Sequence, residues 1–214
     1  MGNLLAEALR ERTMALHAEV ERSGLMQELL RGKLPRAGYC ALLRNLHAIY
    51  RELEDALARR ALDPRIAPLV LPGLERAGRL ARDLETLHGP GWQEELALAP
   101  AARRYRRRLR ELDQRAPLRL LAHAYVRYLG DLNGGQVLLR IVSRNLGLGS
   151  GEGTAFYDFG PVQTTAALAQ KFREGLDAVP VDADEREDLA REARLGFLLH
   201  RRLFAELAAS GVPA

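Results

Sequence analysis

YVRYLGDLNGGQVLLR, residues 125–140, combines two patterns that normally exclude each other. Its apolar residues recur at intervals of three and four, which is typical of a mostly buried helix. Three glycines, Gly130, Gly134 and Gly135, nevertheless lie in its middle. Each interior glycine weakens a helix by about 1 kcal/mol relative to alanine. We therefore predict a helix whose absent side chains leave a bare strip of backbone along one face.

Such a bare strip suits three arrangements: a kink, a very close contact between helices, or a large flat ligand lying on the backbone. The neighbouring polar residues favour the ligand. Asp131 places a carboxylate at the border of the strip, and Arg127 lies one helical turn before it. Because a packing seam needs no carboxylate at its margin, the strip is predicted to form one wall of a ligand site.

Helical spacing continues in both directions from this stretch, and no alternating strand pattern competes with it. The predicted helices are Leu4–Arg22, Leu25–Arg31, Arg36–Arg60, Leu74–Leu87, Ala101–Gln114, Pro117–Leu146, Thr165–Ala178 and Asp182–Ala209. The last of them begins with a capping-box pattern, in which Asp182 is followed by Glu185. We expect an all-α fold that forms a single domain over residues 1–214.

The composition is that of an ordinary globular protein, with 47% hydrophobic and 28% charged residues in a chain of 214. A net charge of +4 suits an anionic ligand or an acidic partner protein and is too small to argue for nucleic acid. Cys40 is the only cysteine, so a reducing compartment is expected. Neither a signal peptide nor an apolar run of membrane-spanning length is present. We predict a soluble, cytoplasmic monomer.

Three polar residues share one face of the first predicted helix. Arg10, His17 and Glu21 follow one another at spacings of seven and four residues. A single histidine on a helix is most often a surface or core residue. Glu21, however, is placed to accept a hydrogen bond from one imidazole nitrogen, which is how metal-bound histidines are usually oriented. The alternative is that these residues simply form a polar helix face.

The chain resembles the haem oxygenase family nearly from end to end. The similarity is carried by LRERTMALHAEVERSGLMQELLRGKL, GPGWQEEL, AHAYVRYLGDLNGGQVL, GEGTAFYDF and GFLLHRRLFAEL. It implies an all-helical domain that holds haem between a proximal helix and a glycine-rich distal helix. It also implies an enzyme that opens haem to biliverdin, with the α isomer expected, together with carbon monoxide and ferrous iron. That reaction uses O2 and electrons from an external reductase.

The resemblance gives roles to residues on both sides of the haem. His17 would be the axial ligand of the iron, and Glu21 would orient it. Gly130 and Gly134 would let the distal backbone lie against the haem face. Asp131 would hold a distal water that supplies a proton when oxygen is activated.

Further residues match positions that surround the haem in the family. Arg10, Tyr125 and Arg173 would contact the propionates, and Phe197 would line the pocket. Arg10 stands where many relatives have lysine, so we expect the haem to be anchored but leave its position in the pocket open. Asn133 replaces a residue that is often serine and leaves a small polar group in the distal region.

The segment AARRYRRRLRELDQR, residues 101–115, is intensely basic. A solvated helix face is the simplest interpretation. The alternative is that an acidic electron donor, a reductase or ferredoxin, docks on Arg103–Arg110, since the chain has no flavin or iron–sulfur motif of its own. Nucleic-acid binding is excluded because the segment lacks the interleaved aromatic residues that stack on bases.

Two other functions remain open at this stage. A haem carrier would share the pocket but would need no distal proton network, so Asp131 argues against it. A helical interaction protein would use the glycines only for close packing, and the register of Arg10, His17 and Glu21 argues against that. His123, Arg127 and Asp131 are four residues apart, which makes His123 a candidate for an outlying member of the distal network.

Overall fold

The structure is a computed structural model that describes residues 4–210, and helices dominate it. The α-helices are α1 (Leu5–Glu21), α2 (Gly24–Leu30), α3 (Arg36–Arg59), α4 (Ala77–Leu87), α5 (Trp92–Glu95), α6 (Pro100–Arg115), α7 (Leu120–Ala124), α8 (Gly130–Leu146), α9 (Val162–Asp177) and α10 (Ala183–Ala209). Short 3-10 turns lie at Ala67–Leu69, Pro117–Arg119 and Ala155–Tyr157. No β-strand occurs among residues 4–210, which confirms the all-α prediction.

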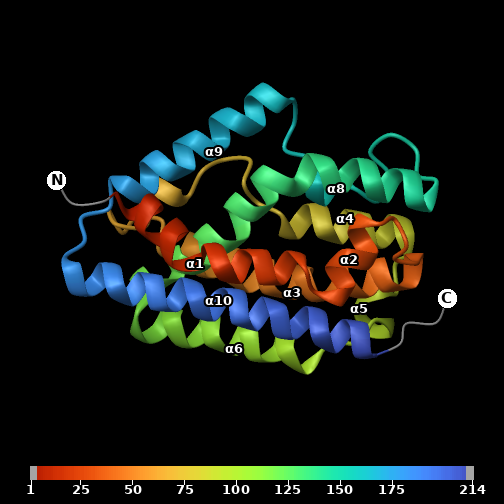
Figure 1. The fold of residues 1–214 in the computed structure, drawn as a ribbon, viewed down its shortest axis with the longest axis horizontal. Coiled ribbons are helices and arrows are strands. Elements are labelled where there is room, and N and C mark those ends of the chain that lie inside the picture. The colour runs from red at the N-terminus through yellow and green to blue at the C-terminus, as the bar shows by residue number, and fades with distance from the viewer. Residues whose placement is uncertain (1–3, 211–214) are drawn as a thin grey trace.

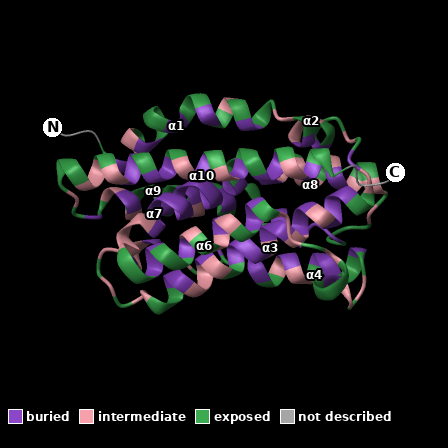
Figure 2. Ribbon diagram, turned by 90° about the horizontal axis from the view of Figure 1, so that it is seen from below, coloured by how far each residue is buried: buried purple, intermediate pink, exposed green. Residues whose placement is uncertain are grey.

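The long helices pack in layers around one hydrophobic core. Helix α10 contacts α1 on one side and α6 on the other, and α3 packs on both α4 and α6. Helix α8 lies along the opposite edge of the molecule, where it contacts α2 and α9 (Figure 1). Figure 2 shows that the buried faces of α3, α6 and α7 meet in the interior, while α1 and α10 expose their outer faces. The fold thus leaves α1 and α8 facing each other.

The helix predicted over Pro117–Leu146 has the expected extent, because every residue of the segment is helical, but it is not a regular α-helix. The segment is divided into a 3-10 turn, α7, a π-helical turn at Tyr125–Leu129, and α8. A π-turn inserts an extra residue into a helix, shifts the register and bends the axis, and it is frequent at functional sites. Here it ends directly before Gly130, so the glycine-bearing segment begins with a changed direction.

The sequence predicts the start of α10 but not the start of α4, although side chains cap both helices. The capping box at the start of α10 is confirmed: the backbone N–H of Glu185 donates to Asp182 Oδ1 at 2.8 Å, and that of Asp182 donates to Glu185 Oε2 at 3.2 Å. Helix α4 begins at Ala77 instead of Leu74. Its first N–H groups are bound by Glu54 on α3, including Ala77 N at 3.1 Å from Oε2. That cap comes from a distant helix and leaves no local pattern.

Membrane insertion can be checked on the same helices. None of those within residues 4–210 is both long enough and apolar enough to cross a bilayer.

Candidate active site

A cleft runs between α1 and α8 and consists of two adjoining cavities. The inner cavity, of about 350 Å³, is lined largely by aliphatic and aromatic side chains. The outer cavity, of about 650 Å³, opens toward α9 and the start of α1. Both cavities are lined by His17, Val126, Gly130, Asn133 and Phe197, so they form one continuous space. We refer to it as the α1–α8 cleft.

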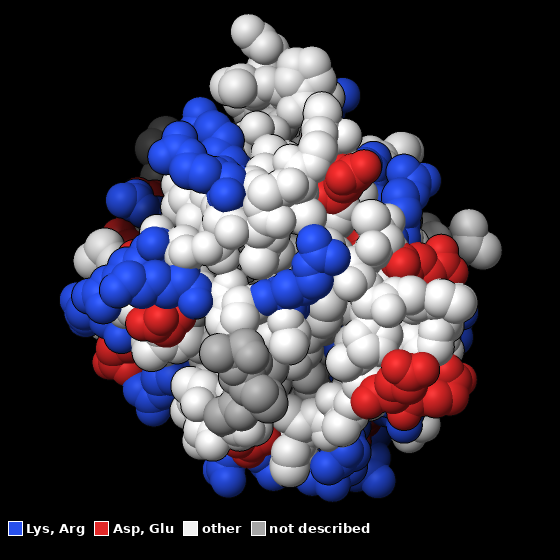
Figure 3. Space-filling model, turned by 90° about the vertical axis from the view of Figure 1, so that its right-hand side faces the viewer, with Lys and Arg blue, Asp and Glu red and all other residues white. Residues whose placement is uncertain are grey.

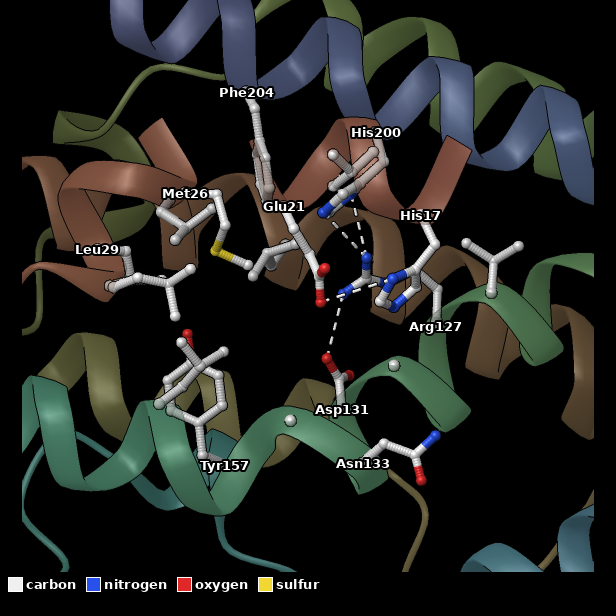
Figure 4. A pocket seen from close by; sticks show the side chains of 18 of the residues that line it. His17, Glu21, Met26, Leu29, Arg127, Asp131, Asn133, Tyr157, His200 and Phe204 are labelled. Atoms are coloured by element: carbon white, nitrogen blue, oxygen red, sulfur yellow. Dashed lines mark hydrogen bonds and ion pairs between the residues drawn. The ribbon is translucent and has the colours of Figure 1, made fainter. Parts of the chain in front are cut away.

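His17 reaches the cleft because it lies at the edge of the apolar stripe of α1. Leu9 and Leu16 are buried in the core, and His17 follows Leu16 about 100° further around the helix, with its side chain about half exposed. Its Nδ1 lies 3.6 Å from Glu21 Oε1, and its ring meets the edge of Phe197 at a centroid distance of 5.8 Å. Figure 4 shows His17 and Glu21 directed into the cavity. Since Nδ1 faces the carboxylate, Nε2 is the nitrogen available to a ligand.

The glycines of α8 divide into two kinds. A Cβ atom added to Gly130 or Gly134 would meet nothing within 4 Å, and both residues line the cleft. A Cβ atom on Gly135 would lie only 3.1 Å from the carbonyl oxygen of Tyr157. The strip predicted as one bare surface therefore serves two purposes: Gly130 and Gly134 face the ligand space, and Gly135 permits close packing.

A buried polar network borders the cleft on the side of α8. Arg127 donates from Nε to Tyr50 Oη at 3.2 Å and from Nη2 to Asp131 Oδ1 at 3.4 Å. The Tyr50 hydroxyl donates to the other carboxylate oxygen of Asp131. Arg127 Nη1 lies 3.1 Å from His200 Nδ1 and 3.2 Å from Nε2. Figure 4 shows Arg127 between His200 and Asp131. The Arg127–Asp131 ion pair therefore lies at the cavity wall, with Tyr50 and His200 as its hydrogen-bonding partners.

Burial sets the protonation of this network. It raises the pKa of Asp131, although the charge of Arg127 and the hydrogen bond from Tyr50 oppose that shift. Burial lowers the pKa of His200 well below its ordinary value, and Arg127 pushes it in the same direction. His200 is therefore a neutral imidazole that accepts from Arg127. A carboxyl group with a raised pKa beside a cavity is able to exchange a proton with bound water.

The outer mouth of the cleft carries two arginines, beside the carboxylates of Glu7 and Asp177. Arg10, Tyr125 and Arg173 all line the outer cavity, and both arginines are exposed. The Tyr125 hydroxyl lies 3.4 Å from Thr13 Oγ1, and Arg173 Nη2 donates to Asn133 Oδ1 at 3.3 Å. Burial raises the pKa of Tyr125, while Thr13, Arg10 and Arg173 all oppose the shift. Carboxylates bind readily to guanidinium groups, so the mouth suits an anionic end of a ligand.

The structure brings together the residues that sequence reasoning proposed and adds two that it missed. Tyr50 lies on α3, far from Arg127 in the chain, and no local pattern points to it. His200 follows Phe197 by three residues on α10, and that spacing, which puts both on one helix face, was a usable signal.

His123, in contrast, does not contact Asp131 or Arg127. It is fully buried and lies 3.0 Å from the Tyr105 hydroxyl and 2.9 Å from Glu192 Oε1. Arg108 donates to the same carboxylate from the surface side, with Nε 3.0 Å from Oε1. His123 therefore belongs to a separate network between α6, α7 and α10.

Comparison with known proteins gives one consistent result. Residues 3–206 match the family model described as heme oxygenase. Heme oxygenase 1 of Homo sapiens is 38% identical over 205 residues, which cover 95% of this chain and 71% of that protein. Heme oxygenase 1 of Nostoc sp. is 33% identical over 207 residues, covering 97% and 87%. Heme oxygenase-1 from Synechocystis sp., solved in complex with heme, superposes with a TM-score of 0.92 at 32% identity and covers 97% of this chain and 94% of its own.

The family model spans almost the whole chain, and the cleft has the polar and glycine-lined walls described above. Members of the matching family are oxidoreductases that degrade haem by opening its porphyrin ring to biliverdin, carbon monoxide and ferrous iron. This chain belongs to the haem oxygenase family and is a haem-degrading enzyme.

Proposed function

We propose that the α1–α8 cleft holds haem with His17 as the axial ligand of the iron and with the Gly130–Gly134 backbone against the opposite face. The observation that carries this proposal is that His17 and the two bare glycines line one cavity from opposite helices. Bound haem supplies both the iron that activates O2 and the porphyrin that is opened. The remaining chemistry belongs to the side chains around it.

The cleft has the properties that haem requires. Its inner part is apolar, with Leu29, Leu42 and Leu46 in the lining, as suits a porphyrin ring. Its outer part carries Arg10 and Arg173, which can each bind a propionate through two parallel hydrogen bonds. A bare helix backbone allows the flat ring to approach closely.

His17 and Glu21 act together on the proximal side. A neutral imidazole is a suitable axial donor for haem iron, and it needs a partner that fixes which nitrogen is free. Glu21 Oε1 lies 3.6 Å from Nδ1, so it would accept from this nitrogen and leave Nε2 free toward the cleft when haem is bound. Phe197 limits rotation of the imidazole from its edge.

Asp131 is the residue we assign to proton delivery. Its Oδ1 faces Arg127 and its Oδ2 accepts from Tyr50, so the carboxyl group is held at the cavity wall. At this position it would hold a water molecule in the cavity, and its raised pKa suits it to pass a proton to that water. Arg127 and the neutral His200 fix its orientation. A simple haem carrier has no use for this network.

We also propose that the α-meso carbon is the one that is opened. Arg10 and Arg173 line the outer end of the cleft and would fix the orientation of the haem there, while Gly130 and Gly134 line its inner end and would set how closely the distal backbone approaches the ring. Together they would select the edge of the ring that lies beside Asp131.

The electrons come from an external donor protein in this proposal. Docking of a reductase or ferredoxin on Arg103–Arg110 of α6 stays an untested prediction, as do the monomeric state and the cytoplasmic location.

The proposal is tested by an aerobic absorption time course of the protein loaded with haemin and supplied with ascorbate. We expect the haem band to disappear and biliverdin, mainly the α isomer, to be extracted at the end. A haem complex that forms and persists without ring opening would identify a carrier. Absence of a haem band would return the glycines to a role in packing alone.

A further inference from the structure

The inner cavity has one polar side chain that the distal network does not use. Tyr157 lines this cavity, and only 2% of the residue is exposed. Within residues 4–210 its hydroxyl has no hydrogen bond. The other polar side chains of the lining each pair with a side chain of the protein: His17, Glu21, Arg127, Asp131, Asn133 and His200. Because a buried hydroxyl without a partner costs free energy, this one points to a ligand that supplies the partner.

The Tyr157 hydroxyl lies at the inner, apolar end of the cleft. Figure 4 shows Tyr157 extending from the α8 side of the cavity, with its hydroxyl directed toward Leu29 on α2. The lining that α2 and the second half of α8 contribute is entirely apolar: Met26, Leu29, Leu30, Val137 and Leu138. Charged side chains at this end of the molecule lie on its outer surface (Figure 3). A ligand that reaches this end of the cavity therefore meets the phenol as a single polar group among hydrocarbon.

The turn that carries Tyr157 is held on both sides. Asp83 accepts hydrogen bonds from the backbone N–H groups of Ala155 and Phe156, at 2.8 and 2.7 Å. The ring of Tyr157 packs against that of Phe156 with a centroid distance of 4.7 Å, and its carbonyl oxygen lies against Gly135 of α8. A side chain fixed in this way loses little conformational entropy when it binds a ligand.

The phenol is neutral and is able to donate a hydrogen bond. Burial raises the pKa of Tyr157, and the charge of Asp131 adds to that shift while Arg127 opposes it. A neutral phenol pairs with a carbonyl or hydroxyl oxygen, and a hydrocarbon edge offers it no partner.

Haem in the proposed orientation has no such oxygen at this end, but the opened ring does. The iron would lie at His17, which lines both cavities, and the propionates would lie at Arg10 and Arg173 in the outer cavity. The α-meso carbon is diametrically opposite the propionate edge of the porphyrin, so it would face the inner cavity. That edge of haem is hydrocarbon. In the α isomer of biliverdin, each of the two pyrroles that flanked the lost carbon carries a carbonyl oxygen.

We propose that the Tyr157 hydroxyl donates a hydrogen bond to a carbonyl oxygen of the opened ring and thereby forms a binding site for the α product. The inference rests on the proposed function, because it takes the orientation of the ring from Arg10 and Arg173. A donor whose acceptor exists only after the ring is opened stabilises the product relative to haem. An isomer opened at the propionate edge would carry its carbonyl oxygens at the outer mouth, beyond the reach of Tyr157.

The test compares two variants that each lose one buried hydroxyl. Tyr157→Phe removes the proposed donor. Tyr128→Phe is the matched control, because Tyr128 is also buried and its hydroxyl also has no hydrogen bond within residues 4–210, but it does not line the cleft. Absorption titrations of the haem-free proteins measure the affinity for haemin and for the α and γ isomers of biliverdin. Infrared difference spectra measure the carbonyl stretch of each bound isomer.

We expect Tyr157→Phe to weaken binding of the α isomer about fivefold, the effect of losing one neutral hydrogen bond. The carbonyl stretch of that isomer should move to higher frequency. The affinity of Tyr157→Phe for haemin and for the γ isomer should match the wild type, and Tyr128→Phe should match it with all three ligands.

The assignment would be overturned if Tyr157→Phe left both the affinity and the carbonyl frequency of the α isomer unchanged. An equal loss of affinity for haemin or for the γ isomer would also overturn it, as would failure of the wild type to bind the α isomer. Failure of ascorbate-driven ring opening in the haem-loaded wild type would instead refute the proposed function. The biliverdin titration involves no turnover and would still decide the role of Tyr157.

Discussion

Gly134 and Gly135 are neighbours in α8, and the structure predicts that alanine has opposite effects at the two positions. In a helix interior, replacing glycine by alanine stabilises the protein by about 0.5–1 kcal/mol when the new methyl group meets no obstacle. At Gly134 the added Cβ would have no neighbour within 4 Å, so the haem-free protein should gain that amount. For a chain of this size the gain corresponds to a rise in Tm of roughly 1–4 °C.

At Gly135 the same methyl group would lie 3.1 Å from the carbonyl oxygen and 3.7 Å from the Cα atom of Tyr157. Both atoms belong to the backbone, which has to shift to make room. Overpacking of this kind costs about 1–3 kcal/mol, which offsets or exceeds the gain in helix propensity. Gly135→Ala should therefore leave the Tm of the haem-free protein unchanged or lower it by several degrees.

Haem affinity should reverse the order of the two variants: the one that is more stable without haem should bind haem less tightly. The methyl group of Gly134→Ala enters the space assigned to the porphyrin, and we expect haem affinity to fall at least tenfold, or by about 1.4 kcal/mol. Gly135 faces Tyr157 instead, so Gly135→Ala should change haem affinity much less. Thermal unfolding of the haem-free proteins and haem titration followed by absorption measure both effects. If Gly134→Ala binds haem as tightly as the wild type, the glycine strip does not face the ligand.

Four further predictions concern single side chains. Asp131→Asn should retain haem binding but slow ring opening by about 100-fold or more, measured by biliverdin yield, and an unchanged yield would remove its role in proton delivery. His17→Ala should lose the wild-type haem spectrum and recover it with added imidazole; a wild-type spectrum without imidazole would make another residue the ligand. Arg173→Ala should broaden the mixture of biliverdin isomers seen by chromatography, whereas a single unchanged isomer would show that Arg173 does not orient the haem. Burial would raise the pKa of Glu192, but the hydrogen bonds from His123 and Arg108 outweigh it and lower that pKa to about 2. Its contribution to stability is therefore present above the pKa of about 4.3 of an unfolded glutamate and is lost as pH falls toward 2, so the deficit of Glu192→Gln in urea unfolding should shrink from about pH 6 to about pH 3.

Much of this protein was predictable because helical periodicity is a local property. The spacing of apolar residues located the long helices, and the same period placed Glu21 one turn beyond His17 on a single face. The capping box of Asp182 and Glu185 was also visible, since both partners lie within one turn. The glycines of residues 125–140 marked the distal segment for the same reason: they violate a local propensity.

The division of that glycine strip was decided only in three dimensions. The sequence shows that side chains are missing at Gly134 and Gly135 but not what each faces, and it is the 155–157 turn, packed behind α8, that occupies the space beside Gly135. The π-turn before Gly130 could not be predicted either, because the spacing of its apolar residues is the same as in a regular α-helix.

The hydrogen-bonding and ion-pair partners of the charged residues were also decided only by the tertiary structure. Tyr50 and His200 reach Arg127 from α3 and α10, and the carboxylates that neutralise α6 come from α3 and α10. Residue type and spacing therefore determined which helices form and which groups they carry. The folded arrangement determined which glycines remain open and which arginines are ion-paired, because those properties depend on atoms that meet only when distant segments pack together.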